Sequence, residues 1–153
     1  MARTAATALL NHPSDTHADD FLTALAEGLV LSGLAMAVAG NTRPCSGACH
    51  EISHAIDRLF PAKSAPHGEQ VGVGALFATF VRGDQELFAQ MRTCLRKHNL
   101  PVSPEEIGLS IEEFAQAVHF APQTRPDRFT LLEHLELSES ESLAKVNEFI
   151  AAL

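Results

Sequence analysis

Three histidines are the residues of this sequence with the clearest capacity for chemistry. His50 and His54 lie four residues apart, so a helix would carry both imidazoles on one face, with Asp57 near them. His67 follows after a short loop that contains proline. Zinc and ferrous iron bind imidazole nitrogens, and catalytic sites commonly use three protein ligands and one open position. The spacing is compatible with a metal site, and equally with solvated histidines in a chain that contains eight.

The histidine pattern requires a helix from about residue 47 to residue 59. Ser46 stands at the position of an N-cap, and Phe60-Pro61 ends the helical run. The face opposite the histidines is apolar and is expected to meet the core; it comprises Ile52, Ala55, Ile56 and Leu59. Asp57 either orients an imidazole or makes a solvated ion pair with Arg58 or Lys63.

Every other periodic segment also has helical spacing. Helices are predicted over residues 1–12, from Asp19 or Asp20 to Ala39 with Gly40 as the stop, over 68–81, from Asp84 to 98, from Ser110 to 120, and from Asp127 and Ser138 onward. Ser103, Ser110 and Ser138 each precede a glutamate by three residues, which is typical of a capping box. No segment alternates like a strand. The sequence therefore predicts seven or eight helices in an all-α bundle that forms one domain over residues 1–153.

The most apolar run, residues 28–40, is too short to span a bilayer, which needs about 20 residues. We expect it to be part of a buried helix and to make no membrane insertion. The formal charge of -8 argues against nucleic acid as a partner. Three cysteines without a regular framework, and the lack of a basic-then-apolar leader, favour a cytoplasmic protein.

The run of residues 28–36, the motif Asn41-Thr42-Arg43-Pro44-x-Ser46-Gly47-x-x-His50-x-x-Ser53-His54 and the run of residues 67–74 closely resemble the metal-binding half of the sn-glycerol-1-phosphate dehydrogenase family. That family belongs to the iron-containing alcohol dehydrogenase, glycerol dehydrogenase and dehydroquinate synthase-like superfamily. Residues 121–133 resemble the same family's C-terminal signature. The likeness covers roughly residues 15–150. It implies a helical bundle like the C-terminal domain of the dehydroquinate synthase-like fold.

The resemblance also implies a catalytic metal. In the family, a divalent ion held by an aspartate and two histidines polarises a carbonyl or hydroxyl during hydride transfer with NAD(P)H. By motif position the metal ligands here are His50 and His67, and His54 is the catalytic residue, which either faces the substrate or orients a ligand from behind. The ion would be Zn²⁺, or else Fe²⁺ or Ni²⁺. His54 could alternatively be a helix residue bonded to a backbone carbonyl.

Three departures from the family pattern limit the transfer of function. No glycine-rich dinucleotide motif follows a strand, so the family's N-terminal nucleotide-binding domain has no counterpart. The family's aspartate ligand has no matching position. Cys49 stands where the family has glutamate, either as a soft ligand or as a small half-buried side chain. We expect NAD(P) to bind only through a partner domain.

Arg125 and Arg128 suit either phosphate recognition or structural ion pairs between helices, and the structural role is favoured. Two hypotheses for function follow. The first is the metal-binding half of a dehydrogenase that reduces a carbonyl such as dihydroxyacetone phosphate with a separately encoded nucleotide-binding subunit. In this case the isolated chain is inactive, and it could also form a homo-oligomer. The alternative is a non-catalytic paralogue or truncated product that acts as a binding module.

Overall fold

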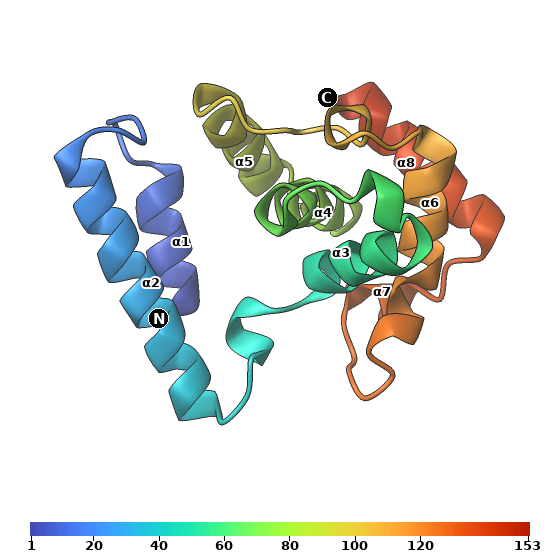
Figure 1. Cartoon of the computed structure of the whole chain (residues 1–153), viewed down its shortest axis with the longest axis horizontal. Helices are drawn as coiled ribbons and strands as arrows, with labels where there is room; N and C mark the ends of the chain where they lie inside the picture. Colours follow the sequence, from blue (N-terminus) through green and yellow to red (C-terminus); the bar gives the residue numbers. More distant parts are fainter. The chain divides into compact units, whose positions relative to one another are not determined.

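The computed structural model describes all residues 1–153 and contains eight α-helices and no strand, which confirms the prediction of an all-α fold (Figure 1). The helices are α1 (Ala2–Leu10), α2 (Asp19–Ala39), α3 (Ala48–Leu59), α4 (His67–Val81), α5 (Gln85–Lys97), α6 (Ile111–Phe120), α7 (Leu131–Leu135) and α8 (Glu139–Ala152). The chain forms two compact units, residues 1–47 and residues 48–153. That the two units act as one domain stays a prediction.

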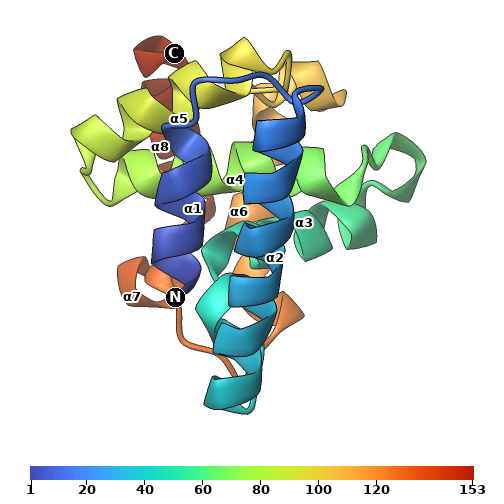
Figure 2. The ribbon, with the colours of Figure 1, turned by 90° about the vertical axis from the view of Figure 1, so that its left-hand side faces the viewer.

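The first unit is a hairpin of α1 and α2, which lie side by side in both views of the ribbon (Figure 2). Gly28 of α2 faces α1, and a Cβ at this position would make ordinary van der Waals contact with the Cβ of Ala5 at 3.6 Å. Gly40 ends α2 in the left-handed conformation at φ 66°, as its sequence position predicted. The helix begins after Ala18, so Asp19 and Asp20 lie in its first turn rather than at the cap.

The expectation that the apolar run in α2 is buried is wrong. Leu29, Val30 and Val38 are 65%, 70% and 76% exposed. The physical reason is that α1 covers only one narrow stripe, to which Phe21 and Ala35 belong. Taken whole, α2 is long and apolar enough to cross a membrane by length and composition alone, and one such helix near the N-terminus is weak evidence of insertion.

The second unit contains the hydrophobic core. Helices α3 and α4 lie against each other, as do α6 and α8, and further contacts join α3 to α6 and α4 to α8 (Figure 1). At the centre, the ring of Phe77 lies edge-on to the rings of Phe114 and Phe149, with centroids 5.7 and 5.6 Å apart. All three rings are fully buried. The buried face of α3 contributes Ile52, Ala55 and Ile56, as predicted.

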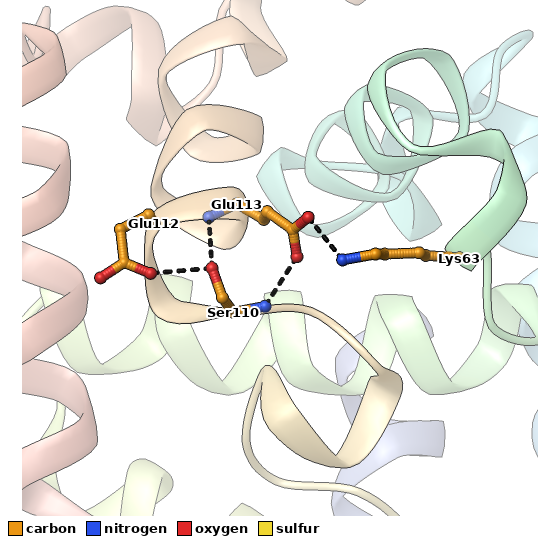
Figure 3. A network of polar contacts seen from close by, with 4 residues as sticks. All are labelled: Lys63, Ser110, Glu112 and Glu113. Atoms are coloured by element: carbon orange, nitrogen blue, oxygen red, sulfur yellow. Dashed lines mark hydrogen bonds and ion pairs between the residues drawn. The ribbon is translucent and has the colours of Figure 1, made fainter.

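Side-chain caps confirm three of the predicted helix starts. Ser110 and Ser138 form reciprocal capping boxes, and Asp84 accepts a hydrogen bond from its own helix. Figure 3 shows the Ser110 box, in which Glu113 also binds Lys63 at 2.6 Å.

Two further predicted caps, besides that at Asp19 or Asp20, are wrong. The turn after Ser103 begins at Pro104 without a side-chain cap. The next helix starts after Thr130 rather than Asp127, because Thr130 and Glu133 form the capping box there.

Candidate functional site

The structure brings the three predicted histidines together where α3 meets the start of α4. The ring centroids of His50 and His67 are 5.3 Å apart, and those of His54 and His67 are 6.1 Å apart in a stacked arrangement. Gly74 permits this approach, because a Cβ there would lie 3.1 Å from the carbonyl oxygen of Cys49. The first half of α3 and the start of α4 therefore carry the imidazoles into one cluster.

His67, itself exposed, is held by a polar chain that runs through the buried Ser53 and Gln70. Its Nδ1 lies 2.9 Å from the hydroxyl of Ser53, which in turn donates to Oε1 of Gln70 at 2.6 Å. The amide nitrogen of Gln70 continues the chain to Asp57 Oδ1 at 3.1 Å. Burial acts to raise the pKa of Asp57, but hydrogen bonds from Ser64 and Gln70 outweigh it and lower that pKa. Asp57 thus reaches an imidazole through two intervening residues.

His54 is held by a guanidinium. Nη2 of Arg125 lies 2.9 Å from Nε2 of His54. An arginine can only donate, so Nε2 of His54 is the acceptor and the ring proton is on Nδ1. Burial first, and then the charge of Arg125, lower the pKa of His54. We expected Arg125 to form a structural ion pair between helices. In the structure its guanidinium instead contacts the imidazole of His54.

His50 is the more enclosed of the two rings whose pKa is shifted. Burial lowers its pKa, and the neighbouring imidazoles and the charges of Arg125 and Arg128 lower it further. Its Nδ1 lies 3.3 Å from Sγ of Cys49. The neutral form is favoured, and neutral imidazole is the form that binds metal ions.

Comparison with known proteins assigns the chain to a family. It is 39% identical over 129 residues to the glycerol-1-phosphate dehydrogenase [NAD(P)+] of Staphylothermus marinus. The aligned residues make up 84% of this chain and 36% of that relative. The enzyme of the same name from Methanosarcina mazei is 35% identical over 153 residues, 98% of this chain and 42% of the relative. The enzyme of the same name from Hyperthermus butylicus is 41% identical over 128 residues, which are 82% of this chain and 36% of that relative. No protein-family model matches the chain.

This chain belongs to the glycerol-1-phosphate dehydrogenase family. It spans about two fifths of the length of the relatives it matches. The partial coverage fits its placement as the C-terminal helical domain of that family.

The residues of this family member fit part of a metal site. His50 and His67 each have a neighbour at Nδ1, which is how ligating histidines are usually oriented, and each leaves Nε2 available. His54 does not, because Arg125 occupies its Nε2. No group of three or more histidine, cysteine, aspartate or glutamate side chains is arranged to hold an ion. Of the three histidines, His50 and His67 therefore leave Nε2 uncommitted, while His54 does not.

One residue beside the histidines has no role in the sequence-based prediction. Glu51 is 1% exposed, and its Oε1 has no hydrogen-bond partner. Its Oε2 accepts from the hydroxyl of Thr130 at 2.8 Å. Burial raises the pKa of Glu51, and the charge of Glu133 adds to the effect. A glutamate on the core side of an amphipathic helix is the signal that could have identified it.

Elsewhere in the second unit, a surface pocket lies between α6 and α7, and Val118, Leu132 and Glu133 are among its lining residues. None of the three clustered histidines lines it. The histidine cluster therefore lies outside that pocket.

Proposed function

We propose that this chain is the metal-binding part of a glycerol-1-phosphate dehydrogenase-like oxidoreductase, and that a nucleotide-binding partner completes its site. The observation that carries the proposal is the cluster of His50, His54 and His67 in a chain of this family. His50 and His67 would hold a divalent ion, Zn²⁺ by the chemistry of the donors and otherwise Fe²⁺ or Ni²⁺. Such an ion would polarise a substrate carbonyl for hydride transfer.

The role of this chain's own residues follows from their contacts. His54 keeps its proton on Nδ1 while Arg125 holds Nε2, so the ring can face a substrate as a neutral donor. Arg125 and Arg128 both act on the imidazoles electrostatically, which puts two guanidinium charges beside the cluster. Guanidinium groups bind phosphate well, so a phosphorylated carbonyl compound such as dihydroxyacetone phosphate is the proposed substrate class.

The partner would supply two things that these residues do not. A third ligand is needed beside His50 and His67 for a site of the usual catalytic kind. A bound nicotinamide is needed because hydride transfer depends on a donor held close to the carbonyl. We propose a separately encoded nucleotide-binding subunit as the source of both.

Zinc binding tests the metal part of this proposal. Titration of the full chain with Zn²⁺ in a calorimeter should show weak binding at one site, weak because water replaces the third ligand. His50→Ala and His67→Ala should each abolish the binding. His119→Ala is the matched control, since this exposed histidine bonds the carbonyl of Leu137 away from the cluster. Zinc binding that survives both cluster variants and is lost in the control would refute the assignment.

A nicotinamide absorbance assay tests the need for a partner. The isolated chain with Zn²⁺, NADH or NADPH and dihydroxyacetone phosphate should show no turnover, because nothing positions the nicotinamide. Activity should appear when a nucleotide-binding partner is added, and His50→Ala should remove it. Turnover by the isolated chain that His50→Ala abolishes would overturn the partner requirement.

A second candidate function is that of a non-catalytic binding module. The exposed apolar side chains of α2, Leu29, Val30 and Val38, favour it, because a contiguous exposed apolar face commonly marks an interaction surface. A chain that binds a partner protein tightly but gives no turnover with it would support this alternative.

A further inference from the structure

We infer that Ser53 and Gln70 are positioning residues that fix the tautomer of His67, with the proton on Nδ1 and the lone pair on Nε2. Ser53 and Gln70 are both fully buried, so water does not compete for their hydrogen bonds. Three contacts carry the inference, and each restricts the next one. The assignment of the tautomer stands on these contacts alone, while its meaning for metal binding rests on the proposed function.

The side-chain amide of Gln70 can take only one orientation. Its Nε2 lies 3.1 Å from Asp57 Oδ1, 2.9 Å from the carbonyl oxygen of Ala65 and 2.9 Å from the hydroxyl of Ser64. Carboxylate and carbonyl oxygens only accept hydrogen bonds, so the group that faces them has to be the NH₂. The amide oxygen Oε1 therefore faces Ser53.

The hydroxyl of Ser53 has a single proton to donate. Oε1 of Gln70 lies 2.6 Å away and can only accept, so this proton is given to it. Ser53 then meets His67 through a lone pair of its oxygen, at 2.9 Å from Nδ1. Nδ1 of His67 consequently carries the ring proton and donates it to Ser53.

The consequence is that the neighbouring imidazoles of His54 and His67 differ in whether the lone pair on Nε2 is available. In His54 the lone pair is also on Nε2, but Arg125 occupies it. In His67 the Nε2 lone pair remains available to a ligand. A chain from Asp57 through Gln70 and Ser53 thus prepares His67 to bind a metal before any ion arrives, by the same arrangement that orients ligating histidines in general.

Nuclear magnetic resonance of the metal-free, full-length chain with ¹⁵N-labelled histidine tests the inference. The spectra are recorded at about pH 8, above the ordinary histidine pKa of about 6.5, where the two tautomers of a neutral ring have distinct nitrogen shifts and couplings. His67 should give the pattern of a protonated Nδ1 and an unprotonated Nε2. The opposite pattern in the native protein would overturn the inference without recourse to any variant.

Variants of Gln70 test whether the buried chain is the cause. Gln70→Met keeps Ser53 and His67 but removes the acceptor, so the hydroxyl is free to donate to Nδ1 and the population should shift toward Nε2–H. Thr79→Val, which removes another buried hydroxyl from α4, is the control and should leave His67 unchanged.

Circular dichroism establishes that each variant is folded before its tautomer is read. A folded Gln70→Met protein that keeps the native His67 pattern would show that Gln70 does not set the tautomer. If Gln70→Met does not fold, Ser53→Ala replaces it, and should lose the uniform Nδ1–H pattern because the acceptor for that proton is gone.

Zinc titration of the same variants separates this inference from the proposed function. Gln70→Met should weaken zinc binding by about tenfold to a hundredfold, the usual effect of removing a group that orients a ligand. A native protein with the Nδ1–H tautomer that binds no zinc would refute the proposed metal site and leave the tautomer assignment intact. A native protein with the Nε2–H tautomer that binds zinc would refute the tautomer assignment and leave the proposed metal site intact.

Discussion

At the scale of single residues, the histidine cluster is organised by neighbours that decide where each proton sits. Arg125 uses the lone pair of His54, Ser53 receives the proton of His67, and the thiol of Cys49 lies against Nδ1 of His50. Burial and nearby positive charge lower the pKa of His50 and His54. The lowered pKa values favour the neutral form of His50 and His54, and neutral imidazole is the form that binds metal ions.

The contact of Arg125 with His54 gives a direct prediction. Arg125→Met removes the guanidinium charge while keeping an unbranched side chain, so the pKa of His54 should rise toward its ordinary value. The rise should be partial, because burial is the larger cause of the lowered pKa. A titration of the His54 ring followed by nuclear magnetic resonance measures it. Arg96→Met, which breaks a surface pair with Glu106, is the control and should leave the His54 titration unchanged.

Glu51 gives a second prediction at this scale. Its pKa is raised in the folded protein, so its contribution to stability is present below the ordinary pKa of 4.5 and is lost as pH rises through the folded value. Glu51→Gln should therefore stabilise the protein at pH 7 to 8, by about 1 kcal/mol as for other buried polar groups, and should change little near pH 4. Urea unfolding across this pH range measures the difference. A variant that is less stable than the native protein at pH 8 would contradict the prediction.

At the scale of helices, the starts that could be predicted are those with a local signal. The boxes at Ser110 and Ser138 satisfy backbone N–H groups within four residues, so the sequence motif is enough to locate them. Ser103 has the same motif, yet Pro104 begins a short 3-10 turn and no side-chain cap forms. Asp127 and Thr130 are both typical N-cap residues, and only Thr130 is followed three residues later by a glutamate that closes a box.

The Ser138 box gives a prediction with the opposite pH sign to that of Glu51. Hydrogen bonds from the Ser138 hydroxyl and backbone N–H lower the pKa of Glu141. The stabilisation is therefore present above the ordinary pKa of 4.5 and is lost as pH falls through the folded value. Glu141→Gln should be less stable than the native chain at pH 6, and the gap should close near pH 3. Paired thermal unfolding curves at the two values measure it, and a gap that widens in acid would rule the explanation out.

At the scale of the whole molecule, features that depend on distant contacts limit what the sequence could predict. The buried side of α3 followed from periodicity, because the core is broad enough there to cover a full helix face. The exposure of Leu29 and Val30 did not follow, because the same apolar residues would be buried against a larger partner than α1. The chain of Ser53 and Gln70 was also missed, since it joins α3 to α4 and has no signature within either helix.

The division into two units yields a prediction for the whole chain. The buried hydrophobic cluster lies entirely within residues 48–153, as do the clustered histidines, Arg125 and the Ser53–Gln70 contact. A segment of roughly 100 residues is long enough to fold around its own core. The fragment 48–153 should therefore show helical circular dichroism, a cooperative thermal transition and the Nδ1–H tautomer of His67.

The matched fragment 1–47 sharpens this comparison, because it contains only the α1 and α2 hairpin with its exposed Leu29, Val30 and Val38. Two helices with so little mutual burial should lack a cooperative transition when they are alone in water. Replacing Val30 and Val38 with lysine should reduce the binding of an apolar dye by the full chain and leave its thermal transition unchanged, since neither residue is part of the core. A loss of the cooperative transition in fragment 48–153 would show that the first unit stabilises the second.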